Sequence, residues 1–213
     1  MKATVRIKNT VYTRVLALVF ILSGCSGKSD LTIVLQPYGT FDARLADTLV
    51  ETISQTYGVK VHLLKNSAFP EDAFIHTKTA RYRADSLIRF LKNDKSDSVD
   101  YIMGLTNQDI SFTKRDTHGN IKKPHSTYSD WGIFGLGYMP GSSCIVSSHR
   151  LQHPDRTVFI ARLKKVAIHE LGHNFGLPHC DSTGCVMQDA VETIQTIDAS
   201  SGHLCASCKK LLP

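Results

Sequence analysis

The sequence predicts an α/β fold with a mixed, twisted sheet, a right-handed strand–helix–strand crossover, one long helix and a small cysteine-rich C-terminal lobe. Three observations predict it. Strand-like and helix-like patterns alternate from residue 31 onward, a long helical segment ends near residue 174, and four cysteines lie between residues 180 and 208. The chain has 213 residues, 42% hydrophobic and 21% charged, which is ordinary usage for one globular domain.

The first three elements predict a parallel crossover. Leu31–Leu35 is apolar except for Thr32, a pattern typical of a buried strand. Asp42–Tyr57 predicts a helix that stops at Gly58, because apolar residues recur in it at helical spacing: Leu45, Leu49 and Ile53. Val59–Leu64 predicts the second strand. A strand, a helix and a strand joined by short links form a right-handed parallel crossover.

The middle of the chain predicts further elements of the same sheet. Arg83–Leu91 predicts a second helix, and Val99–Leu105 predicts a third strand. The polar segment Ser111–Ser129 predicts a mobile loop or an irregular hairpin. Trp131–Met139, which holds three glycines, and Ser143–Ser148 predict an edge strand, because glycine in a strand often marks close approach by another backbone.

The last regular element predicted is a long helix that opens at Pro154-Asp155 and reaches Asn174. Little regular pattern follows it. We therefore divide residues 31–213 into an upper lobe, 31–176, which ends with this helix, and a lower lobe, 177–213, which holds the four cysteines.

The N-terminus predicts a bacterial lipoprotein signal. The first 24 residues hold four basic residues and no acidic one, and the apolar run Val15–Leu22 follows the last base. This run is shorter than the roughly 20 residues that span a bilayer. The junction Leu22-Ser23-Gly24-Cys25 resembles a lipobox, which implies a signal peptide over 1–24, lipidation of Cys25 and a tether over 25–30. We expect a protein anchored to a membrane of the cell envelope; a plain signal peptide is the alternative.

The charge distribution argues against a nucleic-acid partner. The formal net charge is +6, of which the first 24 residues contribute +4, so the remainder carries +2 with no basic run. A surface of this kind lacks the electrostatic footprint of nucleic-acid binding. We expect that the protein has no nucleic-acid partner. We also expect that it is a monomer.

The segment from residue 169 to residue 179 predicts a metal site. On a helix, His169 and His173 are one turn apart and face the same side. Gly176 can turn the chain, so that His179 returns to the same metal. Three neutral imidazoles leave Zn²⁺ an open position for water, and Glu170 is the natural base for that water.

The cysteines predict a second metal site. Apart from Cys25 there are five, and four of them form two close pairs, Cys180 with Cys185 and Cys205 with Cys208. Two such pairs about 20 residues apart are typical of a tetrahedral zinc site. Two disulfides within the pairs are the alternative in an oxidising compartment. The remaining cysteine, Cys144, lies in an apolar stretch and is interpreted as a small buried hydrophobe.

The whole pattern resembles the metzincin clan of zinc peptidases and, within it, the archaemetzincin (archaelysin) family. The resemblance is carried by residues 169–179, by Cys185-Val186-Met187 and by Cys205-Ala-Ser-Cys208. It implies an α+β zincin-type fold and two zinc ions per chain. The ligands implied for the catalytic zinc are His169, His173 and His179, and those for the structural zinc are Cys180, Cys185, Cys205 and Cys208.

The resemblance also implies roles for two further residues. Glu170 would act as the general base, and Met187 would be the Met-turn residue beneath the ligands. Gln188 and Asp189 follow Met187, so the tyrosine that assists zinc in some metzincins has no counterpart here. Among the other histidines, His203 stands out as a possible alternative ligand, because it lies two residues before Cys205.

These observations predict a membrane-anchored zinc metallopeptidase that hydrolyses peptide bonds with water activated by Glu170. An extended peptide substrate would lie along the edge strand at residues 131–148. Two alternatives remain: an envelope lipoprotein that contains zinc and binds peptide without turnover, and a zinc hydrolase of a non-peptide amide. Glu170 argues against the first, because metal binding alone does not need that carboxylate.

Overall fold

The computed structural model describes residues 31–189 and 193–213. The proposed signal peptide, Cys25 and the tether up to residue 30 lie outside the described residues. None of the helices in the described part of the chain is both long and apolar enough to cross a bilayer.

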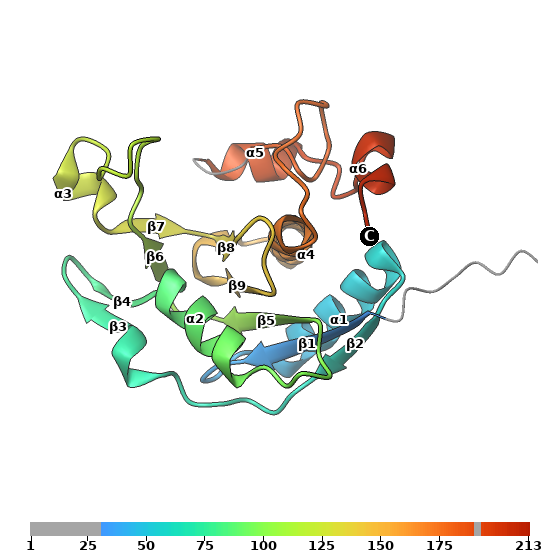
Figure 1. Ribbon diagram of the computed structural model, residues 1–213, viewed down its shortest axis with the longest axis horizontal. Helices are drawn as coiled ribbons and strands as arrows, with labels where there is room; N and C mark the ends of the chain where they lie inside the picture. The colour runs from blue at the N-terminus through green and yellow to red at the C-terminus, as the bar shows by residue number, and fades with distance from the viewer. Residues whose placement is uncertain (1–30, 190–192) are drawn as a thin grey trace, which may run out of the picture.

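A central five-stranded sheet has the strand order β2-β1-β5-β9-β8 (Figure 1). β1 pairs in parallel with β2 and β5, β5 pairs in parallel with β9, and β8 pairs with β9 in antiparallel fashion at the edge. The strand bounds are β1 Thr32–Pro37, β2 Lys60–Leu63, β5 Tyr101–Thr106, β8 Gly135–Gly137 and β9 Ser143–Ser147. The predicted mixed sheet with a parallel β1–α1–β2 crossover is confirmed.

Three helices cover the two faces of this sheet. On one face, Ile33 and Leu35 of β1 share a core with α1 (Ala43–Tyr57) and α4 (Arg156–Asn174). Val34, which points the opposite way, belongs to the core beneath α2 (Ala84–Asp94). This alternation is what a strand buried on both faces requires.

The termini of the long helices follow the predicted signals. The Asp42 side chain accepts hydrogen bonds from the first turn of α1, and Gly58 ends that helix with φ of 69°. The Asp155 side chain caps α4 by accepting from the Thr157 N–H. Carboxylates at these positions satisfy N–H groups that have no partner within the helix.

A second, four-stranded sheet with the order β3-β4-β6-β7 was not predicted. The segment Ser111–Ser129, predicted as a mobile loop or an irregular hairpin, begins within β6 and contains the short helix α3, and the strands β6 and β7 on either side of it pair in antiparallel fashion, as in a hairpin. The bounds of these elements are β3 Phe74–His76, β4 Ala80–Arg83, β6 Ile110–Phe112, β7 Trp131–Ile133 and α3 His125–Tyr128; the 3₁₀ turns are η1 Glu71–Ala73 and η2 His149–Leu151.

The predicted edge strand is corrected in part. The Trp131–Met139 segment divides between the two sheets, as β7 and β8, and β8 is an edge of the central sheet. The Ser143–Ser148 segment is not an edge: β9 lies between β5 and β8, and all five of its residues are buried.

The lower lobe follows α4 and holds two short helices, α5 (Ile194–Ala199) and α6 (Ala206–Lys210). Its small core includes Leu177, Met187 and Leu204, and Tyr57 of α1 packs against it. In Figure 1 this lobe lies above α4 and reaches the C-terminal end of α1. The lobe therefore rests on α1 and on α4, the helix that carries the site described below.

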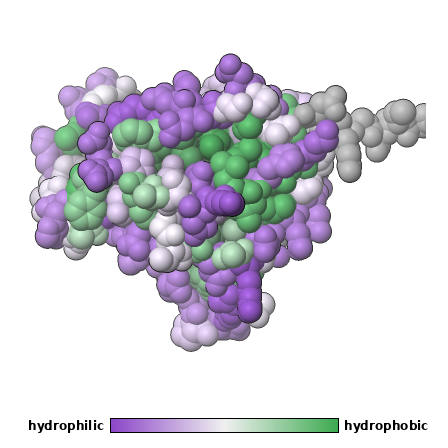
Figure 2. All heavy atoms as spheres, turned by 90° about the horizontal axis from the view of Figure 1, so that it is seen from below, coloured by the Kyte–Doolittle hydropathy of each residue, from purple (hydrophilic) through white to green (hydrophobic). Residues whose placement is uncertain are grey.

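Exposed apolar side chains do not by themselves mark a site. Figure 2 shows the face that lies below in Figure 1, where apolar surface is bordered by hydrophilic atoms. The large exposed hydrophobic residues include Leu63, Leu64 and Phe74. Exposed apolar residues are ordinary on folded proteins.

Candidate active site

Helix α4 places His169 and His173 on one face, and the turn after it brings His179 to them. The helix ends at Asn174, and Gly176 adopts φ of 88°, a left-handed conformation that glycine takes without strain. The chain reverses there, with the Leu177 N–H donating to the Gly172 carbonyl at 2.9 Å. The predicted turn is confirmed, and it delivers His179 three residues later.

The three imidazoles converge. The Nε2 atoms of His169 and His173 lie 3.0 Å apart. The ring centre of His179 lies 5.4 Å from that of His169 and 4.9 Å from that of His173. One nitrogen from each ring falls within 4.8 Å of the others. Such an arrangement offers three nitrogen donors to a single ion.

Backbone carbonyls orient two of the rings. His169 Nδ1 lies 2.8 Å from the Val186 carbonyl oxygen, and His173 Nδ1 lies 2.9 Å from the Leu177 carbonyl oxygen. Each Nδ1 therefore carries the proton and donates, which leaves Nε2 as the lone-pair donor. Burial lowers the pKa of His169 to about 4 and lowers that of His173, so both rings are neutral near pH 7.

Glu170 is buried against the edge of the central sheet. A Cβ placed on Gly135 would lie 2.6 Å from Glu170 Cγ, and one on Gly137 would lie 2.4 Å from the Glu170 carbonyl oxygen. Only glycine lets α4 approach β8 this closely. Burial raises the pKa of Glu170 to about 8, opposed by a hydrogen bond from the Gly137 N–H. A cation on the neighbouring imidazoles would favour the carboxylate form.

Met187 packs against helix α4. Its side chain is fully buried, and a Cβ on Gly172 would come within 2.5 Å of its Sδ atom. Gly172 thus lies between the two histidines of α4 at the point where Met187 packs. The role of Met187 as a Met-turn residue stays a prediction from the resemblance to metzincins.

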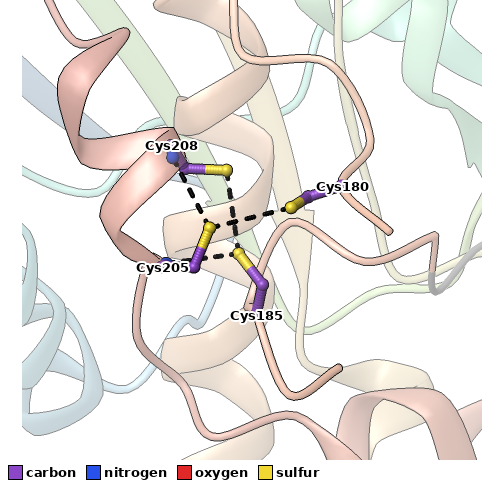
Figure 3. Close-up of side chains that lie close together, drawn as sticks. All are labelled: Cys180, Cys185, Cys205 and Cys208. Carbon is purple, nitrogen blue, oxygen red and sulfur yellow. Dashed lines mark hydrogen bonds between the residues drawn. The ribbon is translucent and has the colours of Figure 1, made fainter. Parts of the chain in front are cut away.

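The four cysteines of the lower lobe form a second cluster (Figure 3). All four are free thiols with their sulfur atoms within 4.8 Å of one another, and the nearest pairs are Cys180 with Cys205 at 3.7 Å and Cys185 with Cys208 at 3.8 Å. A disulfide needs about 2.05 Å, and the close neighbours are not the pairs proposed for disulfides. Zn–S bonds of about 2.3 Å place the sulfurs of a regular tetrahedron about 3.8 Å apart.

The thiols of this cluster differ in acidity. The Cys208 N–H donates to Cys205 Sγ and lowers the pKa of Cys205 to about 6. Burial instead raises the pKa of Cys208. A cation among the sulfurs would bring Cys208 to its thiolate form, since metal binding displaces the thiol proton.

The cysteine cluster and the histidine cluster share one short segment of chain. Cys185 contributes a sulfur atom, the next residue, Val186, supplies the carbonyl that holds His169, and the Met187 carbonyl accepts from the Cys180 N–H at 2.9 Å. Cys180 in turn is bonded to His179. Each cluster therefore orients residues of the other.

A cavity of about 210 Å³ opens beside the histidines. Edge strand β8 forms one wall, and α4 and α5 form the other. The Phe134 carbonyl accepts a hydrogen bond from the Ser147 N–H, so Phe134, the residue before β8, bonds to β9. Bonded and non-bonded residues alternate along an antiparallel strand, so the N–H and C=O groups of Gly135 and Gly137 point away from β9. The described residues thus place a free strand edge, a buried carboxylate and three imidazoles around one cavity.

Comparison with known proteins identifies the family of this chain. The model of Peptidase family M54 matches residues 34–213. The chain belongs to peptidase family M54. It is therefore a metallopeptidase, a hydrolase, as the sequence predicts.

Relatives of known name agree with the M54 assignment. The chain is 28% identical over 192 residues to the archaemetzincin of Haloquadratum walsbyi, covering 85% of this chain and 99% of the relative. It is 30% identical over 178 residues to the archaemetzincin of Methanopyrus kandleri, covering 81% and 91%. The crystal structure of the Methanopyrus kandleri protein superposes with a TM-score of 0.69 at 28% identity, covering 85% and 93%. The predicted fold class is confirmed.

The structure brings together seven of the predicted site residues in two groups and leaves one candidate apart. The groups are His169, His173 and His179, and Cys180, Cys185, Cys205 and Cys208. His203 is exposed and belongs to neither metal group found among the described residues. Cys144 is fully buried in β9, where burial raises its pKa, as expected of a thiol that packs as an apolar side chain.

Two supporting residues of this M54 site were not predicted. The Tyr57 hydroxyl donates to the Ile168 carbonyl at 2.6 Å, and burial raises the pKa of this phenol. Asn174 Nδ2 donates to the carbonyls of Tyr138 and Ser143, both at 3.1 Å, which fastens the β8–β9 hairpin to the end of α4. No local pattern identifies them, because their partners lie 31 to 111 residues away.

Proposed function

We propose that this M54 metallopeptidase is a zinc peptidase whose catalytic zinc is held by His169, His173 and His179, with Glu170 as its general base. One observation carries the proposal: three converging imidazoles and a buried carboxylate face a cavity whose other wall is a strand edge. The donor set suits zinc, because two of the imidazoles are neutral and fixed by backbone carbonyls at their second nitrogen.

The residues around the site divide the work of hydrolysis. A zinc ion held by the three imidazoles would supply a Lewis acid. Glu170, next to His169 and enclosed by Gly135, takes a proton from the attacking water and returns it to the leaving amine. No serine, cysteine or threonine nucleophile is needed. The outward-pointing main chain of Gly135 and the carbonyl of Gly137 offer hydrogen bonds to an extended peptide, whereas the Gly137 N–H already donates to Glu170.

We also propose a structural zinc on Cys180, Cys185, Cys205 and Cys208. The sulfur separations of 3.7 and 3.8 Å support it, because they match the edge of a zinc–thiolate tetrahedron. The lower lobe has only a small apolar core. A metal that fixes four chain positions would supply much of its stability.

The lipid anchor is proposed from the sequence alone. Cys25 stands where a lipobox places the modified cysteine, and only the five residues 26–30 separate it from the first predicted strand. Such a spacer reaches at most about 17 Å. The domain would act at the surface of an envelope membrane, as a monomer.

Replacement of Glu170 by glutamine tests the catalytic role. Glu170→Gln should retain the parent zinc content, because this residue is not a ligand, and should lower peptide cleavage by about 10²- to 10⁴-fold. Cleavage of a diverse peptide library, followed by mass spectrometry, measures the rate. Glu51→Gln makes the same change at an exposed position of α1 and should cleave at the parent rate.

The same experiment separates the alternatives. Membership of a peptidase family favours turnover of peptides over a non-catalytic role. Equal cleavage by the parent and by Glu170→Gln would refute Glu170 as the base. Hydrolysis of small amides, with every peptide left intact, would instead favour a non-peptide substrate.

A further inference from the structure

The central sheet brings the start of the described domain and the turn of the β8–β9 hairpin to the same edge. β1 and β9 both pair in parallel with β5, so all three strands begin at one edge of the sheet, on the right in Figure 1. There the Asp100 N–H donates to the Thr32 carbonyl at 3.0 Å. Two residues later, the Ile102 N–H donates to the Ser142 carbonyl at 2.9 Å. Only β5 therefore separates the first described residues from the hairpin.

The turn of this hairpin, residues 138–142, carries large apolar side chains that the fold leaves uncovered. Tyr138 is 47% exposed and Met139 is 52% exposed. The main chain beneath them is fixed, because the Asn174 side chain donates to the Tyr138 carbonyl at 3.1 Å. The two exposed side chains thus stand on a support that is tied to the end of α4.

A groove of about 400 Å³ lies between the hairpin turn and α2. Two cations of α2, Arg89 and Lys92, line it on one side, and Tyr138 lines it on the other. Asp85, the acid of the groove, ion-pairs with Arg83 at 3.1 Å. Among the described residues, neither Arg89 nor Lys92 forms an ion pair. Two such cations beside a phenol suit a phosphate group.

The rest of this edge carries charges of both signs. Asp94, Asp97 and Asp100 are exposed at the end of α2 and in the segment that leads to β5. Lys60 and Lys95 offset them in part. An edge of this kind is attracted only weakly to an anionic membrane, so the attraction is local to the groove. Such a face would orient a domain that is already anchored rather than hold it alone.

The proposed lipid anchor reaches this edge. Five residues, 26–30, separate Cys25 from the described domain, a span of at most about 17 Å. Neighbouring strands lie about 4.8 Å apart, so β9 begins about 10 Å from the start of β1. A membrane that holds the lipid on Cys25 would therefore lie within reach of the hairpin turn and of the groove behind it.

We propose that this edge is a membrane-docking face, on which Tyr138 and Met139 enter the headgroup region of a phospholipid bilayer. The groove behind them binds a lipid phosphate through Arg89 and Lys92. This inference rests on the proposed lipid anchor and not on the peptidase chemistry. Tyrosine suits a membrane interface, because its ring is apolar and its hydroxyl is polar. Because β8 leads directly into the turn, docking also fixes the direction in which the free edge of β8 faces.

Cutting the tether after reconstitution separates docking from the lipid anchor. A specific protease site is inserted after Lys28, and the lipidated chain is purified in detergent and reconstituted into vesicles. On vesicles with about 30% phosphatidylglycerol in phosphatidylcholine, most of the cut domain should still sediment with the lipid at about 0.1 M salt. Phosphatidylcholine alone, or about 1 M salt, should release most of it, because the surface charge is then absent or screened.

Four variants test which side chains meet the membrane. Arg89→Gln and Lys92→Gln should each lower the vesicle partition coefficient of the cut domain about 5-fold. Tyr138→Ser and Met139→Ser should each lower it several-fold, because they remove apolar area that enters the interface. All four side chains are exposed, so the denaturant midpoint of each variant should match that of the parent.

The matched controls change similar side chains at the opposite edge of the sheet. Leu64→Ser alters a leucine that is 44% exposed and directly follows β2. Arg44→Gln alters an exposed arginine in the first turn of α1, the helix that follows the end of β1. Both should keep the parent partition coefficient. Equal losses in the controls and in the four variants would overturn the proposal.

Hydrogen exchange locates the contact directly. Main-chain N–H groups of residues 138–142 should exchange more slowly on anionic vesicles than in the domain released by salt. Residues 115–121, which precede α3, should exchange equally in both states. Protection of 115–121, with none at 138–142, would place the contact elsewhere and overturn the proposal.

The outcomes distinguish the docking face from the proposed anchor. A parent that carries lipid, but whose domain leaves anionic vesicles as soon as the tether is cut, would refute the docking face and leave the anchor standing. A parent without lipid would refute the anchor and, with it, the reach from Cys25 on which the docking face depends.

Discussion

At the scale of single residues, the approach of α4 to β8 depends on two glycines that meet different parts of Glu170. Gly135 faces the Glu170 side chain, whereas Gly137 faces its main-chain carbonyl. A side chain can change rotamer, but the backbone of a buried helix cannot move without its neighbours. A substitution at Gly135 should therefore affect mainly activity, and a substitution at Gly137 mainly stability.

We predict that Gly135→Ala and Gly137→Ala have different consequences. Gly137→Ala should lower the free energy of unfolding by about 1–3 kcal/mol, because the new Cβ meets backbone. Gly135→Ala should cost less stability but lower kcat, because the Glu170 carboxylate must move. Denaturant unfolding and peptide cleavage measure the two effects. Equal stability losses with equal activities would contradict this account.

The histidines and cysteines could be predicted from sequence because their spacing is local. His169 and His173 lie one helical turn apart, and the cysteines occur as close pairs. The contacts that hold α5 against α4 could not be predicted, because Arg162 binds Asp198 from 36 residues away. Nothing in the pattern of a six-residue helix indicates which long helix it will meet.

At the scale of elements, strand length largely decided which strands could be predicted; β2 has four residues but was predicted because it directly follows a recognisable helix. β1 and β5 each have six residues, enough for an apolar run to stand out, whereas the strands of the second sheet have three or four. The glycines of β8 correctly indicated an edge. β9 was misassigned because a short buried strand resembles an edge until its neighbours are known.

The shared segment Cys185–Met187 predicts that the two metal sites are coupled. Cys208→Ser should lose the structural zinc and also weaken the catalytic one, because Val186 would no longer hold His169 firmly. Metal analysis should give about two zinc ions per chain for the parent and fewer than one for the variant.

The control for this coupling is Cys144→Ala, which removes a cysteine that lies outside the cluster and should retain two zinc ions. A Cys208→Ser protein that still holds one zinc with parent activity would show that the sites are independent.

At the scale of the whole molecule, the anchor can be tested directly. In a bacterium that processes lipoproteins, the parent should fractionate with membranes, whereas Cys25→Ser should block lipidation and cleavage at that site. Mass spectrometry of the mature N-terminus measures this. Cys144→Ser is the matched control and should stay in the membrane fraction. A parent chain that begins at an unmodified residue other than 25 would refute the anchor.

The tripeptide Cys185-Val186-Met187 also constrains how the length of this chain can vary. Each of its three residues contacts a different neighbour: Cys185 lies with the other cysteines, the Val186 carbonyl accepts from the His169 ring, and Met187 packs against Gly172. Insertion or deletion of one residue here would put all three out of register at once, whereas a substitution would disturb only one. Homologous chains that keep both metal sites should therefore place their insertions and deletions elsewhere, and they should keep this spacing even where the residues themselves differ.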